Sequence, residues 1–171
     1  MTEKIWITSD THFFHHNIIK YEQRPYKDID EMNQELIKNW NELVAPDDLV
    51  YFLGDFGIGK AEDLRQILIS LNGKISIVRG NHDDSISKML EIGFASIADQ
   101  LHLKYMGIMC FFTHVPQQPS QLDEVINIHG HIHGKQKFGE RTINVSTDAW
   151  EYRPIELKEL VKQYRKNKKK K

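Results

Sequence analysis

The sequence has a single cysteine, Cys110, among its 171 residues, so the chain cannot form an internal disulfide. Cys110 lies within an apolar run, where a free thiol usually behaves as a small buried hydrophobe. No apolar run approaches the roughly 18 residues of a membrane span, and residues 1–10 lack the pattern of a secretory signal. These absences exclude a disulfide-rich scaffold and predict a cytoplasmic protein without membrane contact.

A strong excess of one charge is also missing, because 23 basic and 24 acidic residues leave a net charge of −1. The balance is uneven along the chain: residues 165–171, RKNKKKK, hold six of the basic residues. Such a run is typical of a disordered end and could also bind nucleic acid. With 40% hydrophobic residues, we expect one domain over residues 1–164 and a basic, disordered tail over 165–171. Nothing in the sequence indicates the oligomeric state.

Short apolar runs rich in β-branched and aromatic residues recur and predict strands. They cover residues 5–9, 49–53, 75–78, 108–112, 125–128 and 142–146. Helical spacing of apolar residues predicts helices over 29–44, 60–71 and 84–92, and PIELKELVKQYRK predicts a strand or turn followed by a last helix. The first half alternates strand and helix, which favours an α/β fold with a parallel sheet covered on both faces, whereas the second half is richer in strands.

Histidines and acidic or amide side chains gather where five of these runs end. The endings are Asp10-Thr11-His12, Asp55, Asn81-His82-Asp83, His114 and His131-Ile132-His133. Ligands of open α/β sheets bind beyond the carboxyl ends of the strands, so we expect these side chains to meet in one cleft. Two residues that are two apart project to the same side wherever the backbone stays extended. Imidazoles together with carboxylates suit divalent manganese, iron, nickel or zinc.

Seven of these residues are candidate metal ligands: Asp10, His12, Asp55, Asn81, His114, His131 and His133. Seven ligands are more than one tetrahedral site can use, and they fit two ions that share a carboxylate. Asp55, alone at its strand end, is the expected bridge. Two divalent cations balanced by Asp10, Asp55 and a hydroxide retain one positive charge, which favours an anionic phosphate ester as the substrate.

This ordered set resembles the calcineurin-like metallophosphoesterase superfamily and spans residues 10–133. The stretches DTHFFHHNII, RGNHD, THVP and HGHIHG, followed by NVSTDAW, are most similar to its small phage and bacterial phosphoesterases. The resemblance implies two mixed β-sheets packed face to face and flanked by helices. It also implies one metal site formed by Asp10, His12, Asp55 and His133, and a second formed by Asp55, Asn81, His114 and His131.

The same resemblance implies a mechanism in which a hydroxide that bridges the two ions attacks phosphorus. His82, which is not a metal ligand in this scheme, would protonate the leaving oxygen. Asp83 would orient a site histidine. His15 and Arg24 match positions typical of the subgroup and are expected to bind substrate, Arg24 through its guanidinium. Phe14 stands where related sequences usually have glycine.

We therefore predict a hydrolase that uses two divalent metal ions to cleave phosphomonoesters or phosphodiesters in a small or nucleotide substrate. Manganese is the first choice of metal, with iron, nickel, zinc and magnesium as alternatives. A nuclease or cyclic-nucleotide phosphodiesterase stays open because of the basic tail. A non-catalytic metal-binding scaffold of the same fold also stays open, although metal binding alone would not require His82.

Overall fold

The computed structural model describes residues 3–119 and 125–168. Its first half contains β1 (Ile5–Thr8), α1 (Ile18–Tyr21), α2 (Ile29–Asn41), β2 (Leu49–Phe52), α3 (Ala61–Ser70), β3 (Lys74–Val78), α4 (Ile86–Ile92) and β4 (Ser96–Ala98). Its second half contains β5 (Leu101–Tyr105), β6 (Ile108–Thr113), β7 (Val125–His129), β8 (Thr142–Asn144), the 3-10 helix η1 (Thr147–Ala149), β9 (Ile155–Glu156) and α5 (Leu157–Lys168). The predicted strands and helices are confirmed. The short elements α1, β4, β5 and η1 were not predicted.

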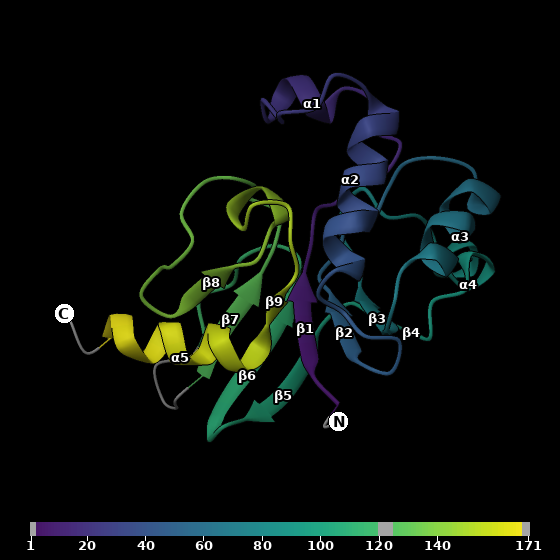
Figure 1. Cartoon of the computed structure of the whole chain (residues 1–171). Coiled ribbons are helices and arrows are strands. Elements are labelled where there is room, and N and C mark those ends of the chain that lie inside the picture. Colours follow the sequence, from purple (N-terminus) through teal and green to yellow (C-terminus); the bar gives the residue numbers. More distant parts are fainter. Residues whose placement is uncertain (1–2, 120–124, 169–171) are drawn as a thin grey trace.

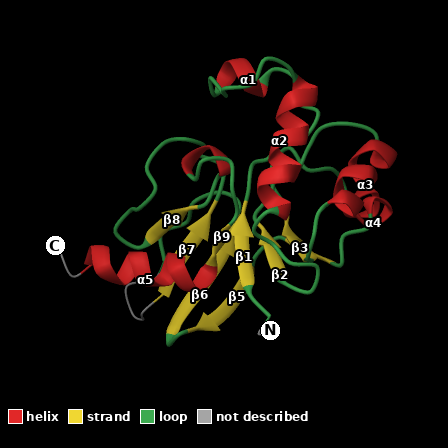
Figure 2. Cartoon of the chain, in the orientation of Figure 1, coloured by secondary structure: helices red, strands yellow, loops and turns green. Residues whose placement is uncertain are grey.

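The described strands form two sheets, in the orders β4-β3-β2-β1-β9 and β5-β6-β7-β8. In the first sheet β1 to β4 run parallel and β9 pairs antiparallel with β1. In the second sheet β6, β7 and β8 run parallel, and β5 is antiparallel to β6. Helices α2, α3 and α4 lie beside the first sheet, while α5 crosses near β6 and β7 (Figure 1, Figure 2). The expected α/β class with two mixed sheets and flanking helices is confirmed.

Alternate residues of the first sheet enter two different cores, because successive side chains of a strand point to opposite faces. Trp6 and Phe52 pack with the helices, whereas Ile7 and Leu53 pack with the second sheet. Burial on both faces explains why the parallel strands have nearly continuous apolar sequences.

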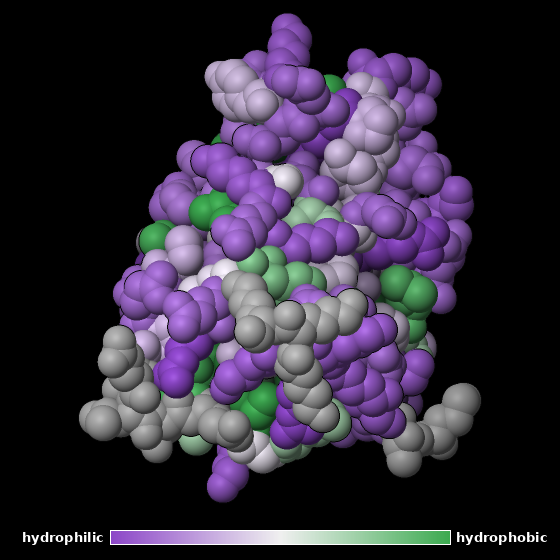
Figure 3. Space-filling model, turned by 90° about the vertical axis from the view of Figure 1, so that its left-hand side faces the viewer, coloured by the Kyte–Doolittle hydropathy of each residue, from purple (hydrophilic) through white to green (hydrophobic). Residues whose placement is uncertain are grey.

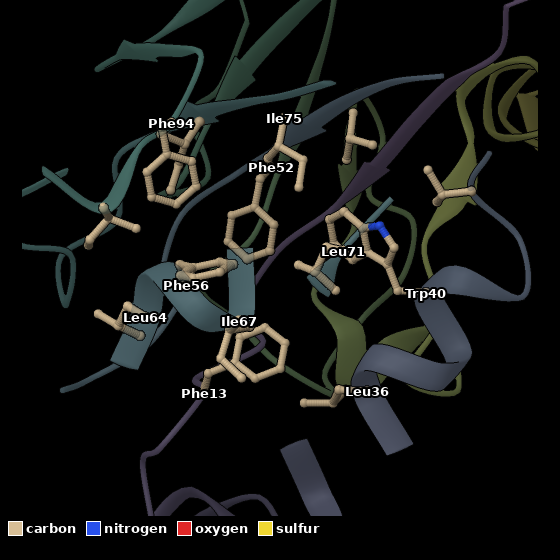
Figure 4. Packing of buried hydrophobic residues seen from close by; sticks show 14 of the residues in the cluster. Phe13, Leu36, Trp40, Phe52, Phe56, Leu64, Ile67, Leu71, Ile75 and Phe94 are labelled. Carbon is tan, nitrogen blue, oxygen red and sulfur yellow. The ribbon is translucent and has the colours of Figure 1, made fainter. Parts of the chain in front are cut away.

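The core beneath the helices is built around aromatic rings (Figure 4). Phe52 lies between Trp40 of α2 and Phe56, with ring centroids 6.3 Å and 5.4 Å away. Phe56 continues the row to Phe94 and to Phe13, at 5.1 Å and 5.2 Å. This row fixes the segments that follow β1 and β2, where the candidate site residues lie.

Helix α5 continues through Lys168, further than we expected. Leu160, Val161 and Tyr164 are buried against the core between the sheets, and their packing stabilises the helix beyond residue 164. Residues 165–168, predicted to begin a disordered tail, form the last turn instead, and Arg165 donates a hydrogen bond to the carbonyl oxygen of Met106. Basic side chains near a helix C-terminus also interact favourably with the helix dipole. Residues 169–171 lie outside the described residues.

The surface seen from the side of β8 and α5 is mostly hydrophilic, with apolar residues in small separate areas (Figure 3). Among the residues described, none of the helices combines the length and the apolar character needed to cross a membrane.

Candidate metal centre

The strand ends singled out in the sequence meet at one edge of the two sheets. Beyond β1 and β2 the two chain segments stay side by side, because the N–H groups of Asp10 and His12 donate to the carbonyl oxygens of Gly54 and Asp55. Ser9 forms an isolated bridge with Ser146, which joins the first sheet to the second next to the site.

The backbone has a positive φ at five of the seven candidate ligands, so the condition of an extended chain, under which residues two apart project to the same side, does not hold at these five. The φ angles are 58° at Asp10, 53° at His12, 59° at Asp55, 70° at His131 and 48° at His133. Non-glycine residues rarely adopt this conformation, and it concentrates at functional sites. Phe14, which replaces a glycine of related sequences, also has a positive φ, of 62°.

Two candidate metal-binding clusters result. The first consists of Asp10, His12 and His133, and the second of Asp55, His114 and His131, with the potential ligand atoms of each within 4.8 Å of one another. Two atoms that each coordinate one ion at about 2.1 Å lie roughly 3–4 Å apart. The limit of 4.8 Å in both clusters is somewhat wider than this, so a cation could be held there with the side chains drawn slightly closer together.

Asp55 faces both clusters. Its Oδ2 lies 3.6 Å from Nε2 of His12 and 3.3 Å from Nε2 of His114. The Oδ1 atom of Asn81 lies 2.9 Å from the same Nε2 of His114, and Nδ1 of His131 is 3.2 Å from it. The structure thus brings all the predicted ligands together, with Asp55 at the junction of the two groups.

One atom has no partner in this arrangement: Nε2 of His12 is buried and makes no hydrogen bond to any residue that the structure describes. Its distance of 3.6 Å from Asp55 and 4.0 Å from Asp10 is too long for a hydrogen bond. A buried polar atom without a partner is costly, and a cation between this imidazole and the two carboxylates would satisfy it. The residues present therefore fit a metal ion.

The protonation states agree with this fit. Burial lowers the pKa of His12 to about 3, so its imidazole is neutral at pH 7. Burial alone would raise the pKa of Asp55, but a hydrogen bond and the charge of His114 lower it to about 2. Burial would lower the pKa of His114, but its contact with Asp55 outweighs that effect and raises it to about 8. At pH 7 the imidazole of His114 is therefore largely protonated, and its charge faces the carboxylate of Asp55.

Hydrogen bonds behind the clusters fix the orientation of two imidazoles. Nδ1 of His133 lies 2.9 Å from Oδ2 of Asp148, and Nδ1 of His114 lies 2.8 Å from the carbonyl oxygen of Leu53. When each Nδ1–H donates to its oxygen, Nε2 keeps its lone pair for a metal ion. Asp148 was not predicted. It does lie within NVSTDAW, one of the stretches that carry the family resemblance, shortly after the strand at 142–146.

Asp83 does not contact a histidine as we expected. Its carboxylate accepts hydrogen bonds from the backbone N–H groups of Asp55, Phe56 and Gly80, at 2.7–2.9 Å. Gly80 has to be glycine, since a Cβ there would lie 2.1 Å from Oδ1 of Asp55. Asp83 therefore ties the ends of β2 and β3 together beneath the second cluster.

Arg24 is buried beneath the site and does not face it. All five N–H groups of its guanidinium have acceptors: two at the Asp148 carboxylate, two at the carbonyl oxygens of Asp10 and Thr11, and one at the sulfur of Met32. No donor remains for the phosphate contact that we expected. Arg24 instead holds Asp148 and the chain segment that carries Asp10.

His82 and His15 lie at the rim of the first cluster. His82 is exposed, with its ring centroid 5.5 Å from that of His12 and 6.2 Å from that of His15. Its backbone N–H donates to Oδ1 of Asp55. Nδ1 of His15 lies 3.4 Å from Nδ1 of His12. Both imidazoles are placed beside the two clusters, without being part of either.

An α/β sandwich with two histidine and carboxylate clusters at one edge is the architecture of a metal-binding phosphoesterase. The chain belongs to the calcineurin-like phosphoesterase family, whose model matches residues 3–171. It is 39% identical to the uncharacterised protein MJ1445 of Methanocaldococcus jannaschii, covering 96% of this chain and 93% of that protein. It is 25% identical to the gene 66 protein of Mycobacterium phage L5, covering 85% of this chain and 86% of the phage protein.

Two solved structures share the fold. A protein of unknown function from Aquifex aeolicus, AQ665, superimposes with a TM-score of 0.76 at 24% identity, covering 95% of this chain and all of the other. A structure described as a novel archaeal phosphodiesterase has a TM-score of 0.50 at 19% identity, covering 90% of this chain and 98% of that one. At these identities the likeness concerns the fold alone.

Proposed function

We propose that the protein hydrolyses phosphate esters with two divalent cations. One cation would be held by Asp10, His12, Asp55 and His133, and the other by Asp55, Asn81, His114 and His131. The observation that carries this proposal is the buried, unpartnered Nε2 of His12, which lies opposite a carboxylate that also contacts His114. The nitrogen and oxygen donors suit manganese first, with iron, nickel, zinc and magnesium as alternatives.

Bound divalent cations would lower the pKa of a coordinated water and neutralise the oxygens of the phosphoryl group. The protein's own part is to hold the ligands in place before an ion binds. Asp148 and the carbonyl oxygen of Leu53 fix the imidazoles of His133 and His114. Asp55 is ionised at pH 7 and His12 is neutral, which are the forms that coordinate.

His82 would act as the general acid. Its imidazole is exposed beside the first cluster, where it can donate a proton to the leaving oxygen of a bound ester. Its hydrogen bond to Asp55 is made by the backbone N–H, so the side chain stays available. His15, at the same rim, would contact the substrate from the neighbouring position.

The test is hydrolysis of p-nitrophenyl phosphate and bis(p-nitrophenyl) phosphate by the purified protein, before and after chelation and with Mn²⁺ added back. We expect chelation to abolish turnover and Mn²⁺ to restore it. Asp55→Asn should lose turnover and at least one metal equivalent, measured by mass spectrometry of bound metal. His82→Ala should keep both metals and lose about 100-fold or more in kcat on phenyl phosphate, whose more basic leaving oxygen needs the proton, with a smaller loss on the p-nitrophenyl esters.

His102→Ala is the matched control for His82→Ala, because His102 is an exposed histidine on β5, outside both clusters. It should retain full turnover of the monoesters phenyl phosphate and p-nitrophenyl phosphate. Activity that resists chelation would contradict the metal mechanism. A protein that binds two ions and cleaves neither ester, nor a cyclic nucleotide or an oligonucleotide, would instead be a metal-binding scaffold.

A further inference from the structure

A polar groove opens directly from the second cluster. Its volume of about 460 Å³ lies within the range of small-molecule sites. Asn81 and His114 form its inner end, so a group attached to a phosphorus atom at the cluster can extend into it. His82 is not part of the groove, since its ring neighbours His12 and His15 at the rim of the first cluster. The site therefore has two separate sides for ester substituents.

The outer part of the groove offers hydrogen-bonding groups that the protein leaves unused. Nε and Nη2 of Arg79 donate to Oδ1 of Asp99, and the other three N–H groups of this guanidinium have no acceptor among the described residues. The side-chain amides of Gln100 and Gln117 are exposed and make no hydrogen bonds within residues 3–119 and 125–168. The groove thus presents hydrogen-bond donors and acceptors together, and the positive charge of Arg79 is already balanced by the carboxylate of Asp99.

Phe111 adds an aromatic ring to the groove. Its ring stacks on His102, with centroids 4.4 Å apart and planes at 13°. This contact fixes the half-buried ring on the outer face of β6. An aromatic ring and amide groups that line one groove are a combination that binds the flat face and the polar edge of a nucleobase.

We propose that this groove binds the nucleoside that remains on phosphorus when a phosphodiester is cleaved, an inference that rests on the proposed function. Water adds to phosphorus, the bond to the ester oxygen beside His82 breaks, and that oxygen takes up a proton. The nucleoside stays in the groove as the monoester product. A monoester substrate has only the leaving substituent and would leave the groove without a ligand. The paired charges of Arg79 and Asp99 favour a neutral heterocycle over a second phosphate.

The experiment compares two diesters with the same leaving group, thymidine 5′-(p-nitrophenyl phosphate) and methyl p-nitrophenyl phosphate, on the manganese-loaded protein. Wild-type kcat/KM should be higher for the thymidine ester by at least about fivefold, the lower end of base–aromatic stacking. Phe111→Ala and, separately, Gln117→Ala should reduce this ratio toward one, and the ratio corrects for any general loss of turnover that affects both esters. Met109→Ala, on the same outward face of β6 but outside the groove, should keep the wild-type ratio.

Binding of the product gives a second readout that does not depend on turnover. Thymidine 5′-monophosphate should bind more tightly than methyl phosphate in isothermal titration calorimetry, and Phe111→Ala should remove the difference. Turnover of both esters with equal kcat/KM, or a preference that neither groove substitution changes, would overturn the nucleoside assignment alone. If the metal-loaded wild type cleaves neither diester but still cleaves p-nitrophenyl phosphate, the nucleoside assignment alone fails. If it cleaves no phosphate ester, the proposed function fails and this inference fails with it.

Discussion

The buried contact between Arg24 and Asp148 is where one substitution should affect stability and metal binding together. Asp148→Asn keeps the size of the side chain, removes its charge and leaves the guanidinium of Arg24 without a counter-charge. The two side chains are only 0% and 4% exposed, and Nε of Arg24 lies 2.8 Å from the carboxylate. Solvent therefore screens this pair very little. Breaking such a buried pair costs about 3–5 kcal/mol.

For a chain of this length, that loss should lower the melting temperature of the metal-free protein by about 6–20 °C. Circular dichroism measures it directly, and the variant stays folded at 25 °C when the total stability lies above the lower end of the usual range of about 5–15 kcal/mol. Because Asp148 also accepts the hydrogen bond of His133, the same variant should bind Mn²⁺ about 10–100-fold more weakly in calorimetry.

Glu42→Gln is the matched control. Glu42 pairs with Arg153 at 2.9 Å, but these side chains are 44% and 41% exposed, so the substitution should cost no more than about 1 kcal/mol. If Asp148→Asn melts within about 2 °C of Glu42→Gln, the buried pair does not stabilise the fold as argued. Unchanged Mn²⁺ affinity would show that Asp148 does not orient His133.

Three further outcomes follow from the structure. Gly80→Ala should lose metal affinity in calorimetry, because its Cβ would lie 2.1 Å from Oδ1 of Asp55, whereas Gly59→Ala, whose Cβ meets nothing closer than 3.7 Å, should bind normally. Backbone hydrogen bonds outweigh the effect of burial and lower the pKa of Asp48 below its usual 3.8, so its stabilisation is lost as pH falls through the lowered value. Asp48→Asn should therefore cost about 1–3 kcal/mol in urea unfolding at pH 7. The cost should shrink as the pH falls below 3.8, and a cost that does not change with pH would refute this. Burial raises the pKa of the Cys110 thiol to about 12, so iodoacetamide should modify it only after unfolding, and rapid labelling of the native protein would contradict that burial.

The candidate ligands could be predicted because each follows an apolar run, and the ends of parallel strands meet at one edge of a sheet. The residues that hold these ligands in place could not be predicted. Arg24 and Asp148 are 124 residues apart, and nothing local to Arg24 distinguishes a buried guanidinium from one that contacts substrate. The left-handed backbone at Asp10 and His12 was missed as well, since alternation along a strand suggests an extended chain. The hydrogen bonds of Asp83 to backbone N–H groups leave no mark in the sequence.

Arg24 and Asp83, whose roles were missed, both hold a strained backbone before any ion binds. A left-handed conformation costs roughly 1–2 kcal/mol at each non-glycine residue, so the segments at Asp10 and Asp55 would relax without support. Arg24 holds the first through the carbonyl oxygens of Asp10 and Thr11, and Asp83 holds the second through N–H groups. The buried guanidinium of Arg24 thus fixes the first segment through the carbonyl oxygens of that segment. The carboxylate of Asp83 fixes the second segment through the backbone N–H groups of that segment. Because the fold meets this cost, the free energy of metal binding is not needed to order the ligands.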